Sequence, residues 1–131
     1  MGKIRVLLAD DHDTVVARVR SILCKDFEVV GTVNNGRDAV AEVRRLDPDV
    51  LVIDISMPIL DGLQAVAQLR PKTCRTKVVF LTVHEDQDYV DAAFAAGASG
   101  YVTKSHVTSD LVPAIREALI GHTYISKSIE P

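Results

Sequence analysis

Five short runs of apolar and β-branched residues recur along the chain, separated by longer segments with a different pattern. Within most of these runs apolar and polar positions do not alternate, which is typical of strands buried on both faces of a sheet. The sequence therefore predicts strands at Ile4–Ala9, Phe27–Val33, Val50–Ile53, residues 78–82 and Gly100–Thr103.

The segments between and after these runs carry apolar residues three or four positions apart, the spacing of one helix face. Gly97 follows the fourth such segment and is expected to end its helix. Pro113 removes one backbone hydrogen bond from the last helix, so we expect that helix to start near Ser109 or Asp110. The predicted helical positions are Val15, Val19, Ile22 and Leu23; Ala39, Val40, Val43 and Leu46; Val66 and Leu69; Val90, Ala93 and Phe94; and Leu111, Ala114, Ile115, Ala118 and Leu119.

Alternating strands and helices predict an α/β fold, because parallel strands need crossover connections that place helices on both faces of the sheet. Five strands and five helices suit a single doubly wound, flavodoxin-like domain. In such sheets ligands bind beyond the carboxyl ends of the strands, where the strand order reverses.

Composition supports one domain, since 131 residues with 47% hydrophobic content can form a single core. A formal charge of −3 provides no broad field for nucleic acid or anionic lipid. The segment 70–77 holds four basic residues and no acid, which is more typical of a solvated loop than of a nucleic-acid site. Two cysteines fifty residues apart, no signal-peptide core and no membrane span favour a cytoplasmic protein.

Polar side chains follow four of the five predicted strands. Asp10 and Asp11 come after the first, Asp54 after the third, and Lys104 after the fifth, while Thr82 ends the fourth. Carboxylates suit Mg²⁺ and an ammonium suits phosphate, so these residue types at one edge predict a site for phosphoryl chemistry. Taken alone, Asp10 and Asp11 could equally cap the first helix.

The segments LLADDH, VLVIDISMPILDGL, VVFLTV and AGASGYVTKS resemble the receiver (CheY-like) domains of bacterial two-component response regulators. The resemblance implies that Asp54 is the phosphoacceptor and that Lys104 contacts the acyl phosphate. It also implies a Mg²⁺ site and a conformational switch. The implied Mg²⁺ ligands are Asp11, Asp54, Asp10 through a bound water and the backbone carbonyl of Ser56; the implied switch residues are Thr82 and Tyr101.

Two further residues are expected beside this site. His84 lies two positions after Thr82, and we expect it to set, together with Ser56, the lifetime of the phosphorylated state. The four histidines share no metal-ligand spacing, so the others are expected to face solvent or cap helices. The family often has Lys-Pro with a cis peptide where Lys104 precedes Ser105, and a cis bond before a non-proline residue costs about 2.5 to 4 kcal/mol.

The stretch 81–126 resembles the NarL/LuxR group, whose output is a C-terminal helix-turn-helix domain. The resemblance implies a receiver over residues 1–122 and the start of a linker over 123–131. It further implies a histidine kinase as donor, homodimerisation on phosphorylation, and DNA binding only through an output domain that controls transcription. A stand-alone receiver and a degenerate receiver used as a binding module are the alternatives.

Two catalytic interpretations fit less well. Segment 31–36 has the glycine spacing of a P-loop, but Arg37 and Asp38 stand where Lys and Ser or Thr are required. A phosphohydrolase of the haloacid dehalogenase type would use Asp54 as nucleophile and a second Asp two residues later, where this chain has Ser56. The sequence therefore favours a regulatory phosphoacceptor over an enzyme.

Overall fold

The computed structural model describes residues 2–69 and 75–126. All five expected strands are present, and only the fourth differs, beginning one residue earlier at Lys77. The strands are β1 (Ile4–Ala9), β2 (Phe27–Val33), β3 (Val50–Ile53), β4 (Lys77–Thr82), β5 (Gly100–Thr103) and β6 (Tyr124–Ile125). The helices are α1 (Asp13–Leu23), α2 (Gly36–Leu46), α3 (Gly62–Leu69), α4 (Gln87–Ala95), the 3₁₀ helix η1 (Lys104–His106) and α5 (Val107–Leu119).

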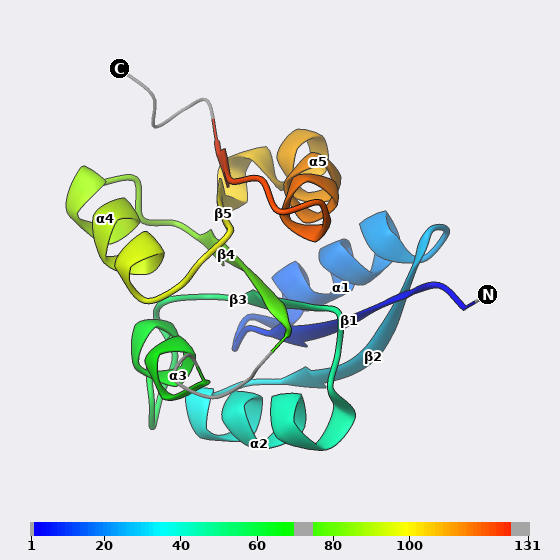
Figure 1. Cartoon of the computed structure of the whole chain (residues 1–131), viewed down its shortest axis with the longest axis horizontal. Helices are drawn as coiled ribbons and strands as arrows, with labels where there is room; N and C mark the ends of the chain where they lie inside the picture. Colours follow the sequence, from blue (N-terminus) through cyan, green and yellow to red (C-terminus); the bar gives the residue numbers. More distant parts are fainter. Residues whose placement is uncertain (1, 70–74, 127–131) are drawn as a thin grey trace.

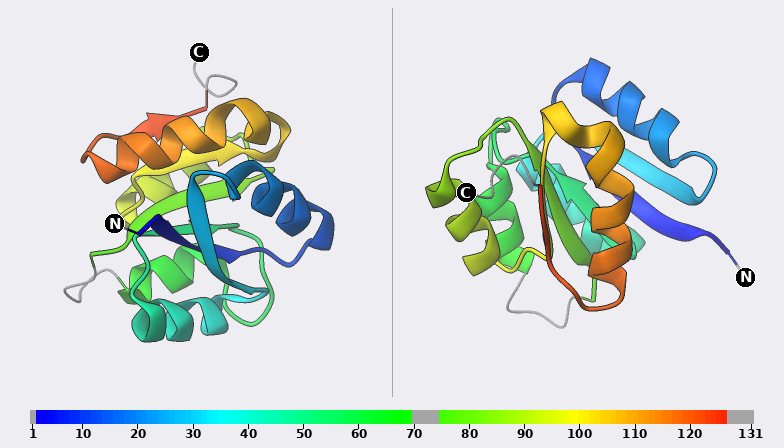
Figure 2. Two further views of the ribbon diagram at one scale, coloured as in Figure 1. Left: turned by 90° about the vertical axis from the view of Figure 1, so that its right-hand side faces the viewer. Right: turned by 90° about the horizontal axis from the view of Figure 1, so that it is seen from above.

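The strands form one parallel sheet in the order β2-β1-β3-β4-β5-β6. Helices α1 and α5 cover one face, and α2, α3 and α4 cover the other (Figures 1 and 2). The doubly wound α/β prediction is confirmed. The chain moves to one side of β1 for β2 and to the other side for β3, so the order reverses beside β1, which is where such sheets bind ligands.

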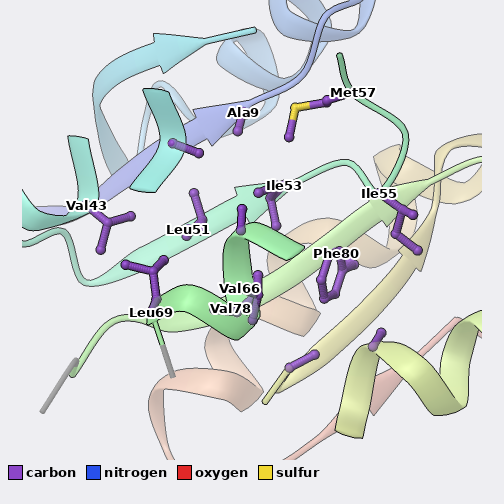
Figure 3. Packing of buried hydrophobic residues seen from close by; sticks show 14 of the residues in the cluster. Ala9, Val43, Leu51, Ile53, Ile55, Met57, Val66, Leu69, Val78 and Phe80 are labelled. Carbon is purple, nitrogen blue, oxygen red and sulfur yellow. The ribbon is translucent and has the colours of Figure 1, made fainter. Parts of the chain in front are cut away.

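Strand β3 shows why the predicted strands lack alternation. Its four residues are all fully buried, yet they belong to two separate cores. Val50 and Val52 pack on the side of α1 and α5, whereas Leu51 and Ile53 pack against the opposite helices (Figure 3). Successive side chains of a strand point to opposite faces, so a strand covered on both faces needs apolar residues at every position.

Within the described residues, the sheet has six strands instead of the expected five. Strand β6 is only two residues long and pairs in parallel with β5, with Gly100 opposite Tyr124 and Tyr101 opposite Ile125. Ser126, the next residue, is fully buried. The segment expected to begin a linker at residue 123 therefore continues along the edge of the sheet up to Ser126.

Helix α5 begins at Val107, so the expectation of a start near Ser109 or Asp110 was wrong. Pro113 lies inside the helix. Val107 is 6% exposed and Leu111 is fully buried. Burial of an apolar side chain stabilises by about 1.5 to 3 kcal/mol, which offsets much of the cost of about 3 kcal/mol for a proline in a helix interior.

Of the basic segment 70–77, residues 70–74 lie outside the described part of the chain. Arg75 forms ion pairs with Asp47 Oδ2 at 3.0 Å and with Asp49 Oδ1 at 2.8 Å. Its charge is thus compensated within the domain, as in an ordinary surface loop. None of the helices in the described residues is both long enough and apolar enough to cross a bilayer.

Candidate functional site

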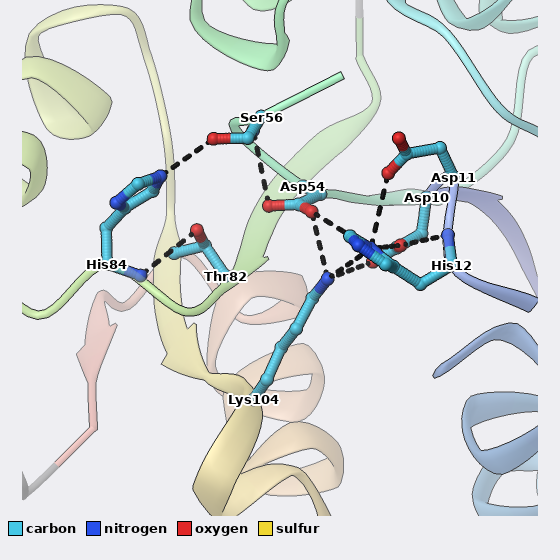
Figure 4. A network of polar contacts seen from close by, with 8 residues as sticks. All are labelled: Asp10, Asp11, His12, Asp54, Ser56, Thr82, His84 and Lys104. Atoms are coloured by element: carbon cyan, nitrogen blue, oxygen red, sulfur yellow. Dashed lines mark hydrogen bonds and ion pairs between the residues drawn. The ribbon is translucent and has the colours of Figure 1, made fainter. Parts of the chain in front are cut away.

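Four neighbouring strands deliver the predicted site residues to one edge of the sheet. Asp10 follows β1, Asp54 follows β3, Thr82 ends β4 and Lys104 follows β5 (Figure 4). The backbone extends this alignment past the strand ends, because the N–H of Asp54 donates to the carbonyl of Ala9 at 2.9 Å. The two buried carboxylates are therefore held side by side.

Lys104 forms an ion pair with each of these two acids. Its Nζ lies 2.9 Å from Asp54 Oδ2 and 2.9 Å from Asp10 Oδ2. The side chains of Asp10 and Asp54 are 1% and 3% exposed, and that of Lys104 is 11% exposed. Burial by itself lowers the pKa of the Lys104 ammonium, but the hydrogen bonds to Asp54 and Asp10 outweigh it and raise the pKa. Lys104 thus carries its charge at neutral pH, facing two buried carboxylates.

His12 joins the cluster, which the sequence did not predict. Its Nδ1 lies 3.1 Å from Asp10 Oδ1, 3.2 Å from Asp11 Oδ1 and 3.2 Å from Lys104 Nζ. His12 occupies the N-cap position of α1 but makes no side-chain capping bond, and Asp10 Oδ1 accepts the His12 N–H at 2.9 Å. The capping interpretation of Asp10 and Asp11 is therefore wrong. In the sequence, the only indication that His12 joins the acidic cluster is that it directly follows Asp10 and Asp11.

The donor set fits a hard cation. Asp10, Asp11, His12 and Asp54 each offer one atom, and these atoms lie within 4.8 Å of one another. Within the described residues, the ammonium of Lys104 is the only partner of the buried Asp10 Oδ2. Three carboxylates with spare oxygen lone pairs match the oxygen ligands that Mg²⁺ prefers.

Ser56 and His84 meet beside the acidic cluster. Ser56 Oγ lies 2.7 Å from His84 Nε2, and the Ser56 N–H donates to Asp54 Oδ1 at 3.3 Å. The His84 ring stacks on Tyr89 of α4, with ring centroids 4.0 Å apart. A hollow next to this contact is lined by Asp11, Ser56 and Tyr89, and by the apolar residues Ile55, Met57, Pro58 and Leu63 together with Asp61. Both residues expected to tune the site therefore lie at its opening.

Thr82 and Tyr101 approach the same turn from adjacent strands. Both are fully buried. Thr82 Oγ1 accepts the His84 N–H at 3.4 Å, and the Tyr101 hydroxyl donates to the His84 carbonyl at 2.8 Å. Burial, followed by the charge of Asp54, raises the pKa of the Tyr101 phenol, so it stays protonated and able to donate.

Gly62 allows the loop after β3 to fold tightly against Asp54. A Cβ at this position would lie 2.0 Å from the backbone oxygen of Asp54. The Gly62 N–H also donates to the carbonyl of Ile55 at 2.7 Å. The start of α3 thus packs directly on the backbone that carries the Asp54 carboxylate.

The peptide bond between Lys104 and Ser105 is trans, as are all the other peptide bonds of the described residues. Lys104 reaches Asp54 and Asp10 in this geometry, at the first position of η1.

Comparison with known proteins agrees with this arrangement. The family model described as response regulator receiver domain matches residues 6–116. The response regulator UvrY of Escherichia coli strain K12 is 39% identical over 128 residues, which cover 96% of this chain and 59% of the relative. The chain thus spans less than two thirds of that protein.

Two solved structures are similar over nearly the whole chain. A two-component response regulator of the LuxR family from Aurantimonas sp. SI85-9A1 superposes with a TM-score of 0.91 at 32% identity, covering 98% of this chain and 93% of that one. The signal receiver domain of the putative response regulator NarL from Mycobacterium tuberculosis gives a TM-score of 0.88 at 29% identity, covering 93% of this chain and 100% of that one.

Proposed function

The chain belongs to the response regulator receiver family, in the NarL/LuxR group of two-component systems, and from this premise we propose that Asp54 is its phosphoacceptor. Receiver domains of this family are regulatory phosphoacceptors. The observation that carries the assignment is the buried Asp54 carboxylate, paired with Lys104 at 2.9 Å and flanked by Asp10 and Asp11. Phosphoryl transfer depends mainly on positioning and charge neutralisation, which this arrangement supplies.

The reaction is a displacement at phosphorus. A carboxylate oxygen of Asp54 forms a bond to phosphorus while the bond between phosphorus and the donor's imidazole nitrogen breaks. The electron pair of that bond returns to the nitrogen, and the product is a mixed anhydride on Asp54. Lys104 donates hydrogen bonds to oxygens of the transferring group, because its ammonium already lies 2.9 Å from the acceptor carboxylate.

Asp11 and Asp54 would hold Mg²⁺ directly, Asp10 through a water, and Ser56 through its backbone carbonyl. When bound, the cation draws the anionic donor and the anionic acceptor together. Without it, the three acids repel one another and the donor, and Lys104 compensates only part of that charge. For this reason, phosphorylation should depend on a divalent cation.

Thr82 and Tyr101 form the switch in this proposal. Phosphorylation adds nearly two negative charges with strong acceptor oxygens, and the Thr82 hydroxyl is free to rotate toward them as a donor. Thr82 and Tyr101 both contact His84, through Oγ1 and through the phenol hydroxyl. Movement of Thr82 therefore alters the turn against which Tyr101 packs, and the change spreads toward α4 and β5.

The remaining roles concern a longer protein. We infer a receiver over residues 1–122 and a linker that starts at 123, whose first residues, up to Ser126, stay docked on the edge of the sheet. We also infer a sensor histidine kinase as donor, a C-terminal DNA-binding output domain and homodimerisation on phosphorylation, all in the cytoplasm. The support is the similarity to UvrY and to a LuxR-family regulator. The −3 charge of this chain favours DNA contact through the output domain rather than through the receiver.

Regulatory phosphorylation is favoured over enzymatic turnover. A phosphatase acting through an aspartyl phosphate needs a carboxyl general acid near the nucleophile. Ser56 stands two residues after Asp54, and its hydroxyl is engaged with His84. We expect no sustained hydrolysis of external phosphomonoesters.

The test is intact-mass measurement after incubation with Mg²⁺ and acetyl phosphate. The wild type should gain one phosphoryl group, and Asp54→Ala should gain none. A matched control is Asp88→Ala, which removes an exposed acid in the first turn of α4 and should leave the gain unchanged. A chelator should abolish the adduct in the wild type.

Retention of the adduct in Asp54→Ala would overturn the assignment of the acceptor. If the wild type shows no adduct, binding of beryllofluoride, a mimic of the phosphoryl group, is measured next. Binding would indicate rapid hydrolysis of the acyl phosphate, and no binding would favour the degenerate receiver.

A further inference from the structure

Ser126 is fully buried at the end of the described chain and contacts three residues of two elements. Its N–H donates to the carbonyl of Tyr101 at 2.9 Å. Its Oγ accepts the Thr103 N–H at 3.1 Å and donates to Asp110 Oδ2 at 2.8 Å. One residue thus connects strand β5 with the first turn of α5.

We propose that Ser126, oriented by Asp110, is a positioning residue for Lys104. The inference rests on the proposed function, because Lys104 is assigned there to the transferring phosphoryl group. Ser126 touches neither Asp54 nor Lys104. It acts through the backbone of Thr103, which directly precedes Lys104 in the chain.

The pairing of β5 explains why this contact matters. Regular pairing with β6 ends at Tyr101 and Ile125, whereas pairing with β4 continues to Thr82 and Thr103. On the outer edge of the sheet, the Thr103 N–H is held by the side chain of Ser126. Thr103 is therefore fixed on both sides, and it is the last strand residue before Lys104 begins η1.

The chemistry of the contact requires a hydroxyl. Only a group that donates and accepts at once can bond both a backbone N–H and a carboxylate. Asp110 is 8% exposed, and its other oxygen accepts the Ser109 hydroxyl at 3.1 Å. Alanine at position 126 would leave a buried N–H and a buried carboxylate oxygen without this partner, which favours a shift of the strand end. Threonine would keep the hydroxyl.

The same residue links the switch to the C-terminal segment. Ser126 bonds the backbone of Tyr101, and the Tyr101 hydroxyl bonds the carbonyl of His84. We therefore expect a change at His84 or Lys104 to reach the segment that ends in Ser126. By reciprocity, the docking of that strand also biases the site.

The first test compares phosphorylation kinetics of Ser126→Ala and Ser126→Thr in the full 131-residue chain, with Mg²⁺ saturating and acetyl phosphate varied. We expect Ser126→Ala to lower the maximal rate about five- to tenfold, with a smaller change in the half-saturating concentration, because displacement of a group in the transition state lowers the rate of the chemical step. Ser126→Thr should keep the maximal rate within about twofold of the wild-type value, because it keeps the hydroxyl.

Val43→Ala is the matched control. Val43 is buried in α2, and its truncation should lower stability without removing any polar group of the site. It should leave the maximal rate unchanged. An unchanged rate in Ser126→Ala, or an equal fall in Val43→Ala, would overturn the inference. Absence of phosphorylation in the wild type would instead contradict the proposed function.

A second measurement needs no variant. In the wild type, hydrogen exchange of the Thr103 and Ser126 amides should slow at least about threefold when Mg²⁺ and beryllofluoride are added, because the ligand and the docked strand favour the same state. The amide of Val43 serves as reference and should not change. If beryllofluoride binds and neither amide responds, the proposed link between Ser126 and the site is refuted.

Discussion

The hydroxyl of Ser56 lies 2.7 Å from Nε2 of His84, and this contact joins the loop after β3 to the loop after β4. The imidazole is held in place on its other side by stacking on Tyr89. We expect this contact to limit the access of water to an acyl phosphate on Asp54. The pair therefore forms a bridge at the opening of the site.

Breaking this bridge should shorten the lifetime of the phosphorylated state. We expect Ser56→Ala and His84→Ala each to raise the rate of phosphate loss about two- to tenfold, the range given by a net hydrogen bond of about 0.5 to 1.5 kcal/mol. The measurement is the decay of the phosphorylated mass after removal of the donor.

Val83→Ala is the control for that experiment, because Val83 lies in the same loop but is 64% exposed. Its decay should match the wild type. If the two residues act as one bridge, the double variant should decay no faster than the faster single variant. Decay at the wild-type rate in both single variants would rule out the tuning role.

Removal of Lys104 should make the domain dependent on a divalent cation for stability. Lys104→Met leaves the buried Asp10 and Asp54 carboxylates without their shared partner, and loss of one member of a buried ion pair costs about 3 to 5 kcal/mol. In chelator, the free energy of unfolding should fall by up to that amount. Mg²⁺ should then raise the unfolding midpoint more in the variant than in the wild type.

Urea titrations with and without Mg²⁺ measure this effect. Lys25→Met, which replaces an exposed lysine, is the control and should respond to Mg²⁺ as the wild type does. An equal response of Lys104→Met and wild type would show that Lys104 and the cation do not compensate the same charges.

Gly62 should tolerate no side chain. The Cβ of Gly62→Ala would lie 2.0 Å from the backbone oxygen of Asp54, so the loop or α3 must move. We expect a loss of about 2 kcal/mol or more in the free energy of unfolding, together with slower phosphorylation. Gly2→Ala is the control, since nothing lies within 4 Å of its Cβ. Wild-type stability and phosphorylation in Gly62→Ala would disprove the close packing.

Asp49 should contribute to acid sensitivity. The backbone N–H of Arg5 and then the guanidinium of Arg75 lower the pKa of the Asp49 carboxyl. A folded-state pKa below the unfolded value of about 3.9 stabilises the domain at higher pH, and this stabilisation is lost as pH falls through the folded-state pKa. The free energy of unfolding should therefore decline less steeply below about pH 5 in Asp49→Asn than in the wild type.

Urea unfolding at several pH values checks this. Arg75→Ala should give an intermediate slope, because the Arg5 N–H remains in place. If the free energy of unfolding declines as steeply with falling pH in Asp49→Asn as in the wild type, the contribution of Asp49 is disproved.

The sequence by itself determined the sheet and the composition of the site. A strand covered on both faces must be apolar at every position, so β3 and its neighbours were visible with nearly correct ends. Parallel strands place their carboxyl ends at one edge, so the residues after them had to gather there. Asp10, Asp54 and Lys104 do so, with Lys104 Nζ 2.9 Å from a carboxylate oxygen of each acid.

Only the tertiary structure decided the orientation of His12 and the role of Ser126. His12 could cap α1 or turn toward the acids, and the local sequence is compatible with both. In the structure, His12 makes no side-chain capping bond, and its Nδ1 lies 3.1 Å from the buried Asp10 carboxylate. Ser126 makes its side-chain bonds to residues 16 and 23 positions away. No local pattern encodes such a contact.

Strand β6 and the start of α5 illustrate the same limit. A two-residue strand has no periodicity, and it exists because β5 offers an unpaired edge. Helix α5 starts at Val107 because that side chain is buried in the core, in spite of Pro113. The hydrophobic pattern of the sequence thus predicts the strands and their doubly wound arrangement. Edge pairing, helix ends and the partners of buried polar groups depend instead on which distant surfaces meet.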